Sequence, residues 1–518
     1  MNPNGLEPIS DEGAYATLAQ ALTTTGQYKM ISLPGEPYHT KYPILFPWML
    51  SWIWRFSPSF PANISALRFL NIMFGAGFMM LLVRVFTKLC EGNRRESLLL
   101  VSLCALNPAV LSSSTTLSSE ASYLFFSTLA ILSVLEQEQR PWNLYWFGLS
   151  LISLVAAFYV RMPAVSLLVA VEIYLLLGRR LRESIGMALG TTALIFPWLY
   201  WCHTHNNSNR FPEFVFYNDY ISDFWRFVTS HGLISLLTNN MVFIFVGIPK
   251  LLIYPFQTDL RIISQLTAWL GFAALGLLVM GFFRSYQHPK FRLIHWYVVV
   301  YVTMLLLCPY PAGERFLEPL LPFFYWFILI EIRRFVGRLT PSRCAERKRL
   351  VTILPVVSML CIVIAWAITS LICLGFHTVE FALNKRRELA TYENSFRDMN
   401  ESFAWIRKET SPSDVLMANL YSLYYLHTGR KTTPLFFDSS RRLTEPKFDE
   451  APIRKYAIRY LIVSDLDFGV YVPTVVKAMR QELRRVIGAN QGLHFDKKFT
   501  SQLGKYEIYR IDGTNRNH

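Results

Sequence analysis

The sequence is short of charge. Only 17% of its 518 residues are Asp, Glu, Lys or Arg, while 52% are hydrophobic; soluble globular proteins carry about a quarter charged residues. The shortage is concentrated in long apolar segments. Because a backbone in lipid must satisfy its own hydrogen bonds, such segments predict membrane-spanning helices. The chain is therefore predicted to be a polytopic integral membrane protein.

Several signatures of other protein classes are also missing. The seven cysteines have no metal-ligand spacing and mostly sit in or beside apolar segments, which indicates packing residues. The sequence contains no glycine-rich phosphate-binding fingerprint and no low-complexity segment. No signal peptide precedes Asp11, although the loop that holds it is expected outside the cytoplasm. Either the N-terminus is translocated unaided, or a first spanning helix ahead of this loop is missing from the sequence; we favour the second.

The apolar segments number about ten, and several of them are short and have ambiguous boundaries. They are Leu67–Thr87, Leu98–Ser114, Ala121–Leu135, Leu144–Val160, Ala164–Leu177, Ile185–Trp201, Leu266–Phe283, Ile294–Cys308, Phe316–Ile332 and Val351–Phe376. The segment "MVFIFVGIPKLLIYPF" (residues 241–256) is also apolar, but Gly247, Pro249 and Lys250 interrupt it. We expect it to lie at the outer membrane interface, where aromatic residues are favoured.

The net charge of +15 comes largely from short loops between these segments. Basic residues cluster at Arg94–Arg95, Arg179–Arg182, Arg284–Arg292 and Arg333–Arg349. Loops rich in Lys and Arg stay cytoplasmic, and all four clusters fall on one side of the predicted topology. This distribution argues against a nucleic-acid partner. It places the first loop and the C-terminal region outside the cytoplasm.

From about His377 the composition becomes that of a soluble domain. "DVLMAN" and "RYLIVSD" predict strands, "LYSLYYLHTG" predicts a helix that ends at Gly429, and "PTVVKAMRQELRRVIGA" predicts an amphipathic helix. "LHFDKKFTSQLGKYEIYRI" predicts a closing hairpin. The predicted fold is mainly α. It is a polytopic helical bundle over residues 1–376, with extracytoplasmic loops at 1–63 and 202–262, followed by a small extracytoplasmic α/β domain over residues 377–518.

Carboxylates occur in the predicted extracytoplasmic loops. Asp11 and Glu12 are adjacent in "SDEGAY", and Glu120 lies at the outer mouth between two spans. A carboxylate there can act as a general base, and an acidic residue at the membrane boundary is a functional candidate. The structural alternatives are that Asp11 caps a helix that runs from Gly13 to Leu22, and that Glu120 is exposed in a short turn.

Cations fall on the same side of the membrane. Lys41 can bind a phosphate as a point charge, and Arg161 and Arg315 can hold one with the planar fork of their guanidinium groups. The alternatives are an interface anchor for Lys41 and an ion pair with a nearby glutamate for Arg315. His39 next to Lys41 could assist, although a single loop histidine is usually structural. Carboxylates and cations on one face suit a reaction on a lipid-linked phosphate.

These motifs, in this order, resemble those of the membrane glycosyltransferases of the GT-C superfamily, of the protein O-mannosyltransferase and lipid A aminoarabinose transferase type. The matching segments are "SDEGAY", "TKYPILFP", "NPAVLSSSTTLSSEASYLFFSTLAIL", "FYVRMPAVSLLVAVEIYLLL", "ERFLEPLLPF", "AWIRKETSPSDVLMAN" and "YYLHTGR". The resemblance runs over nearly the whole chain. It departs at Ile44, where the family has a second proline after the lysine, and at Glu120, where the family has an aspartate.

The resemblance implies inverting sugar transfer by single displacement, outside the cytoplasm, in a bacterial inner (plasma) membrane. The implied donor is a sugar on a polyprenyl phosphate, and the acceptor is a hydroxyl of a lipid, a glycan or a protein. The residues implied are the base Asp11 with its neighbour Glu12, and the phosphate-binding Lys41, Arg161 and Arg315. His39 and Glu120 could join the acidic pair at a divalent cation or at the acceptor, although no ligand spacing demands a metal.

Two other functions are compatible with such a sequence. One is a transporter or lipid flippase, and the other is a non-catalytic relative whose outer domain binds glycans. Transporters often show internal repeats and broken helices at the membrane midplane. Here the spans show no evident repeat, and the polar residues gather at the outer ends of the spans instead of the midplane. This placement favours the glycosyltransferase.

Overall fold

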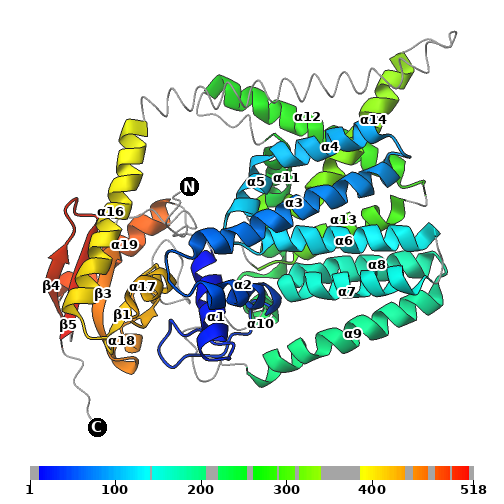
Figure 1. Cartoon of the computed structure of the whole chain (residues 1–518). Helices are drawn as coiled ribbons and strands as arrows, with labels where there is room; N and C mark the ends of the chain where they lie inside the picture. Colours follow the sequence, from blue (N-terminus) through cyan, green and yellow to red (C-terminus); the bar gives the residue numbers. More distant parts are fainter. Residues whose placement is uncertain are drawn as a thin grey trace.

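The structure is a computed structural model that describes residues 11–139, 143–205, 220–253, 261–288, 291–309, 314–339, 385–437, 447–464, 473–489 and 493–512. The described part is mainly helical, as predicted, and carries a five-stranded sheet near the C-terminus. Long helices lie side by side in one bundle, and the sheet stands beyond one end of it (Figure 1). Helices α1 (Glu12–Thr24) and α2 (Leu45–Phe56) lie between the bundle and the sheet.

The bundle consists of predominantly apolar helices with short connections. Its helices are α3 (Ile64–Leu89), α4 (Arg94–Leu106), α5 (Pro108–Thr115), α6 (Glu120–Gln139), α7 (Leu144–Val160), η1 (Met162–Ala164), α8 (Val165–Leu177), α9 (Leu181–Thr204), α10 (Tyr220–His231), α11 (Leu233–Leu252), α12 (Arg261–Ser285), α13 (Arg292–Leu306), η5 (Glu314–Leu320) and α14 (Leu321–Leu339).

Four of the described helices are long and apolar enough to cross a membrane: α3, α9, α11 and the part of α12 from Ala268 to Ser285. The pair α4 and α5, bent by 64°, adds a fifth if both belong to one span. Helices α7 and α13 and the segment Met162–Leu177 are apolar but shorter. The predicted segments up to residue 332 fall on described helices, whereas Val351–Phe376 lies outside the described residues. The predicted count of about ten spans stays a prediction.

The segment 241–256 differs from the predicted surface helix. Most of it belongs to α11, which is a candidate span and packs against α12, α13 and η5. Pro249 does not end the helix. It contacts α12 at a point where a Cβ on Gly271 would lie 2.8 Å from the Pro249 Cβ. The proline therefore does not break the segment; it lies inside α11 and forms part of the contact with α12.

Helices α12 and α14 also pack closely. A Cβ added to Gly281 of α12 would overlap the carbonyl oxygen of Phe327 in α14. Only glycine allows the two backbones to approach in this way, and small residues serve the same purpose in membrane helix packing.

Ion pairs join the helices at the end of the bundle farthest from the sheet, which we call the far end. Lys88 pairs with Glu136 at 3.1 Å, and Arg333 of α14 pairs with Glu96 of α4. Further pairs there are Arg180 with Glu183 and Arg284 with Glu331. The described residues of the four basic clusters therefore lie at one end of the bundle, as their position in the sequence predicts.

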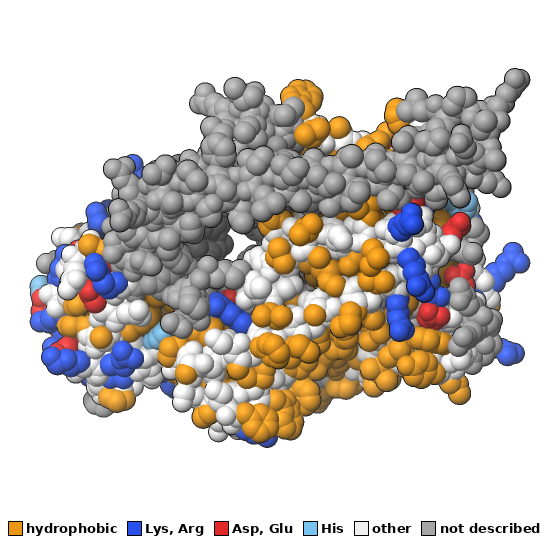
Figure 2. All heavy atoms as spheres, turned by 45° about the horizontal axis from the view of Figure 1, so that its top comes forward, with side chains coloured by type: hydrophobic (Ala, Val, Ile, Leu, Met, Phe, Trp, Pro, Cys, Tyr) orange, Lys and Arg blue, Asp and Glu red, His pale blue; other side chains and the backbone are white. Residues whose placement is uncertain are grey.

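The surface of the bundle is apolar. Figure 2 shows hydrophobic side chains over much of the helical body, with Lys and Arg side chains toward its far end and over the sheet domain. Large exposed side chains such as Met80, Leu189, Phe196 and Trp269 contribute to this surface. A contiguous apolar surface of this kind is typical of a protein that faces lipid.

The C-terminal domain is a mixed sheet covered by helices. Its elements are α16 (Lys385–Glu409), β1 (Val415–Met417), α17 (Tyr421–Thr428), β2 (Thr432–Thr433), α18 (Ala451–Lys455), β3 (Ile458–Ser464), α19 (Pro473–Ala489), β4 (His494–Thr500) and β5 (Tyr506–Asp512). The strand order is β2-β1-β3-β5-β4, parallel across the first three strands and antiparallel after them. The predicted strands, helices and hairpin are all present. Gly429 ends α17 with a φ of +72°, which favours glycine.

This domain contacts the loop region that contains α1 and α2. The backbone N–H of Thr432 donates to the carbonyl of Ser32 at 2.8 Å, and Lys431 Nζ lies 2.9 Å from Glu36 Oε1. Helix α17 packs on the start of α1 so closely that a Cβ on Gly13 would lie 3.0 Å from the Cβ of Ser422. The sheet domain is thereby fixed beside the first residues of α1.

Candidate active site

Asp11 lies at the start of α1, at the end of the bundle nearest the sheet, which we call the domain end. It occupies the N-cap position, but among the described residues its side chain makes no capping hydrogen bond. Its Oδ1 instead accepts a hydrogen bond from the hydroxyl of Tyr42 at 3.0 Å. Its Oδ2 lies 3.3 Å from a guanidinium nitrogen of Arg315. The helix-cap alternative is therefore not supported.

Arg315 joins Asp11 to a second carboxylate. Its Nε lies 3.8 Å from Glu120 Oε1, and the same oxygen pairs with the guanidinium of Arg161. The ring of Phe316 contacts both cations, with its centroid 5.4 Å from Arg161 and 5.3 Å from Arg315. Glu314, the glutamate that directly precedes Arg315 in the sequence, pairs with Lys250 at 3.5 Å. Four candidate residues from distant parts of the chain therefore form one cluster.

The members of this cluster differ in exposure. The side chains of Asp11 and Arg315 are 34% and 43% exposed, whereas those of Glu120 and Arg161 are 8% and 15% exposed. Removing one partner of a buried ion pair leaves an uncompensated charge, which is strongly destabilising. Glu120 and Arg161 are thus a buried supporting pair. Asp11 and Arg315 are the two charged groups that a substrate can reach.

The turn before α6 places Glu120. Asn71 of α3 is fully buried and donates to the carbonyls of Thr116 and Ser118, the latter at 2.7 Å. The hydroxyl of Tyr15 in α1 is hydrogen-bonded to Ser119 Oγ at 2.9 Å. Glu120 then begins α6, where the positive end of the helix dipole favours a carboxylate.

Glu12 lies in a different setting from its neighbour. It is fully buried, its Oε1 accepts from the backbone N–H of Leu117 at 2.7 Å, and its Oε2 lies 3.6 Å from Arg68. A carboxylate held in this way is not accessible to a substrate, so the structure does not support the predicted catalytic role for Glu12. Its contacts fix the first turn of α1 against α3 and the turn before α6, and hence the position of Asp11.

His39 and Lys41 lie in the loop between α1 and α2 and are 0% and 3% exposed. His39 Nε2 accepts from the backbone N–H of Tyr42 at 2.9 Å, and its carbonyl accepts from the indole N–H of Trp201 at 3.1 Å. The thiol of Cys202 donates to the carbonyl of Thr40 at 3.3 Å. The end of α9 therefore holds this loop. The burial of Lys41 does not fit an exposed interface anchor, and the contacts of His39 indicate a structural role.

The pH dependence of stability tests this assignment of His39. Burial, with a smaller contribution from Lys41, lowers the pKa of His39 from 6.5 to about 3. Between these values the unfolded chain binds a proton that the folded chain does not, so the folded state loses up to about 1.4 kcal/mol per pH unit as the pH falls. In His39→Gln the side-chain oxygen can still accept from Tyr42 and does not titrate. Thermal unfolding between about pH 6.5 and pH 4 should therefore show a shallower pH slope in this variant than in the wild type; equal slopes would contradict the assignment.

The candidate metal ligands are placed apart or engaged by other groups among the described residues. In the part of the chain that the structure describes, no group of three or more His, Cys, Asp or Glu side chains is placed to hold a metal ion. Glu120 is engaged by two arginines, and His39 Nε2 accepts a backbone hydrogen bond. The divalent cation that we considered for His39, Glu120 and the acidic pair therefore has no cluster of ligands here.

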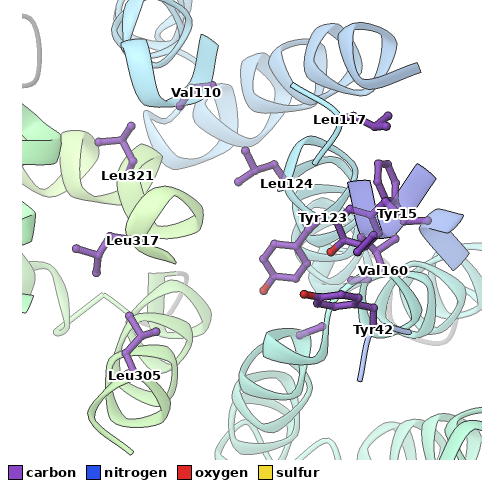
Figure 3. Packing of buried hydrophobic residues seen from close by; sticks show 14 of the residues in the cluster. Tyr15, Tyr42, Val110, Leu117, Tyr123, Leu124, Val160, Leu305, Leu317 and Leu321 are labelled. Carbon is purple, nitrogen blue, oxygen red and sulfur yellow. The ribbon is translucent and has the colours of Figure 1, made fainter. Parts of the chain in front are cut away.

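Several site residues were not singled out from the sequence. Tyr15 and Tyr42 pack against each other with ring centroids 5.0 Å apart, and Figure 3 shows them beside Tyr123 and Val160 in the buried cluster. Tyr42 directly follows Lys41 in "TKYPILFP", so the lysine motif held a signal for it. Phe316 likewise follows Arg315, but an aromatic residue after an arginine is too common to be informative.

The chain is similar to known membrane glycosyltransferases in part of its sequence and in its fold. Residues 41–201 match the family described as dolichyl-phosphate-mannose-protein mannosyltransferase. No curated protein sequence matches the chain. The structure is similar to the crystal structure of ArnT from Cupriavidus metallidurans bound to undecaprenyl phosphate, with a TM-score of 0.53 and 13% identity over 98% of this chain and 95% of that one.

A second similar structure is the archaeal oligosaccharyltransferase AglB from Archaeoglobus fulgidus in complex with an inhibitory peptide and a dolichol-phosphate. The TM-score is 0.54 and the identity 11%, over 98% of this chain and 70% of that one. The chain has the GT-C fold. The resemblance predicted from the sequence is confirmed. The family match includes Lys41, Glu120 and Arg161, whereas Asp11 and Arg315 lie outside the matched residues.

Proposed function

We propose that this chain is an integral membrane glycosyltransferase that moves a sugar from a polyprenyl-phosphate donor to an acceptor hydroxyl, with inversion at the anomeric carbon. The observation that carries the proposal is the pair formed by Asp11 and Arg315. They are the accessible carboxylate and cation of an otherwise buried cluster, 3.3 Å apart at the domain end. One can take a proton while the other neutralises a phosphate.

The reaction needs a base and a phosphate site on opposite sides of the anomeric carbon. Asp11 accepts the proton of the acceptor hydroxyl as its oxygen forms a bond to that carbon. The bond between the carbon and the phosphate oxygen breaks, and its electron pair leaves with the polyprenyl phosphate. Arg315 stabilises this anion by direct contact, and the less exposed cations Lys41 and Arg161 contribute through their charge. No general acid is required, because the leaving group is already a stable anion.

The similar proteins support a lipid-phosphate donor. The matching family is described as using dolichyl-phosphate-mannose, and the similar structures contain undecaprenyl phosphate or dolichol-phosphate. Such lipids place their phosphate at the membrane boundary. The candidate site lies at the end of the bundle, beside α2, whose Trp48, Trp52 and Phe56 are exposed on one face. Amphipathic aromatic rings favour this boundary.

We propose the orientation from the basic residues. Lys and Arg side chains gather at the far end of the bundle, which supports a cytoplasmic position for that end under the positive-inside rule. The site and the sheet domain are then extracytoplasmic, in the inner membrane of a bacterium. The acceptor is a hydroxyl of lipid A, wall glycan or protein that meets the donor on this side.

Purified full-length protein in lipid nanodiscs tests the proposal. We expect it to bind undecaprenyl phosphate and to transfer label from an undecaprenyl-phosphate-linked hexose or pentose to a bacterial envelope fraction. Free undecaprenyl phosphate should appear in equal amount. The protein without its sugar-lipid is the blank. Absence of both binding and transfer with every sugar-lipid in the panel would overturn the proposal.

A further inference from the structure

The carboxylate of Asp11 is not fixed by its own helix. It stands at the N-cap position of α1 without a capping hydrogen bond among the described residues, and it is one-third exposed, at 34%. A partly exposed aspartate side chain without a capping hydrogen bond can rotate between several positions. A general base, in contrast, must be held within hydrogen-bond reach of the proton that it removes, and misplacement by about 1 Å can cost about 100-fold in rate.

Tyr42 supplies a fixed partner. Its hydroxyl donates to Asp11 Oδ1 at 3.0 Å, while its ring packs against Tyr15 and His39, each with centroids 5.0 Å apart. The tyrosine is only 9% exposed. The phenol hydroxyl is therefore a well-held donor beside the two accessible charged groups of the site, Asp11 and Arg315.

The backbone of Tyr42 is held as firmly as its ring. Its N–H donates to His39 Nε2 at 2.9 Å, and its carbonyl accepts from the hydroxyl of Tyr28 at 2.8 Å. Both partners are buried, at 0% for His39 and 3% for Tyr28. These contacts orient a residue that directly follows the predicted phosphate-binding Lys41. One short turn thus carries both the lysine and the group that holds the base.

From this geometry we propose that Tyr42 is a positioning residue for Asp11. By holding Oδ1, it keeps Oδ2 on the accessible side of the cluster, beside Arg315, where the acceptor hydroxyl can reach it. The inference rests on the proposed function, since it assigns Tyr42 a role through the base. It also links the two halves of the site, because the position of Lys41 and the position of Asp11 are set by the same turn.

The experiment is Tyr42→Phe in the full chain, assayed with undecaprenyl-phosphate mannose or whichever sugar-lipid the wild type uses. The variant loses the hydrogen bond from the Tyr42 hydroxyl to the Asp11 carboxylate. If this bond holds the base in its reacting position, kcat should fall by about 10- to 100-fold. The donor KM and the Kd for undecaprenyl phosphate should change by less than about twofold, because Tyr42 does not hold the phosphate. A purely structural role would instead disturb binding and catalysis together.

Tyr424→Phe is the matched control. It also removes a buried phenol hydroxyl, one that is hydrogen-bonded to Ser402 Oγ at 3.1 Å inside the sheet domain. We expect similar small losses of thermal stability in the two variants and normal transfer in Tyr424→Phe. A Tyr42→Phe protein that unfolds far below the control would overturn the inference, because the hydroxyl would then act on the fold.

A double variant separates action through Asp11 from any other action. In an Asp11→Asn background, Tyr42→Phe should lower the residual rate by less than about twofold, because residues that act as a unit are not additive. Wild-type kcat in Tyr42→Phe, or a full second loss in the double variant, would overturn the role of Tyr42 alone. Absence of transfer by the wild type would instead overturn the proposed function, so the two failures are distinguishable.

Discussion

Asp11→Asn is expected to lower the rate of sugar transfer by about 100- to 10,000-fold, the contribution of a general base. The asparagine keeps the shape and still accepts from Tyr42, but it cannot take the proton. The ion pair with Arg315 that is lost is more than one-third exposed on each side, at 43% and 34%. Such a pair contributes about 0–1 kcal/mol to stability, so the variant should fold normally. Transfer and thermal unfolding are measured on the same preparation.

Glu12→Gln is the informative companion to this variant. Glu12 is fully buried and accepts the N–H of Leu117, a bond that a glutamine oxygen can keep. Its substitution should lower stability through the Arg68 contact while leaving kcat within a factor of about ten. An Asp11→Asn protein that is folded and transfers sugar at the wild-type rate would remove Asp11 as the base.

Arg315→Ala is expected to weaken undecaprenyl phosphate binding by about 10- to 150-fold, as for the loss of a charge-assisted contact of about 1.5–3 kcal/mol. Arg315 is 43% exposed, so its removal should leave the fold intact. Lys41→Met, which keeps the aliphatic stem of a buried side chain, should weaken binding in the same direction. Binding is measured by titration of the lipid into nanodiscs that hold the protein.

Lys88→Ala is a suitable control for these variants. Lys88 also pairs with a glutamate, Glu136, at 3.1 Å, but the pair lies at the far end of the bundle and neither side chain is buried, at 21% and 22% exposed. It should bind the lipid normally. Arg161→Ala is a poorer probe, because it would strip the buried Glu120 of its partner and could unfold the site. Unchanged lipid affinity in both Arg315→Ala and Lys41→Met would contradict the proposed phosphate site.

The contact between Arg315 and Asp11 predicts in which direction Asp11→Asn changes the affinity for the lipid phosphate. In the structure Arg315 is shared between Asp11 and Glu120, so a phosphate must compete for it. Asp11→Asn should therefore tighten lipid binding, and the gain should be smaller in an Arg315→Ala background. Simple repulsion between Asp11 and the phosphate would give the same gain in both backgrounds.

Local patterns predicted most elements of this chain. Leu144–Val160 was predicted as a helix with its observed bounds from its uninterrupted apolar run, and in the structure Asn143 caps its start. Helix α19 begins at Pro473 as predicted, since proline suits the first turn. The segment around Pro249 was interpreted differently. Its proline and glycine suggested a surface helix, but their effect depends on α12, which packs against them.

For the candidate site, too, the sequence predicted some features and left others open. The sequence by itself determined which residue types are present. It also predicted that they lie on one side of the membrane, because apolar segment length and basic loops relate directly to the chemistry of lipid. It also offered Asp11, Lys41, Glu120, Arg161 and Arg315 as candidates. It could not distinguish the role of Asp11 from that of Glu12, because nothing in the sequence shows which of two adjacent acidic side chains is buried between helices.

Only the tertiary structure decided which of these side chains meet. Arg315 and Asp11 are 304 positions apart, and their 3.3 Å contact exists because η5 and α1 converge at the domain end. Glu12 turns inward because its carboxylate accepts a backbone N–H from a turn 105 residues away. Tyr42 gains its partner in the same manner. Charge and hydropathy are properties of each residue, whereas orientation comes from neighbours that folding brings close.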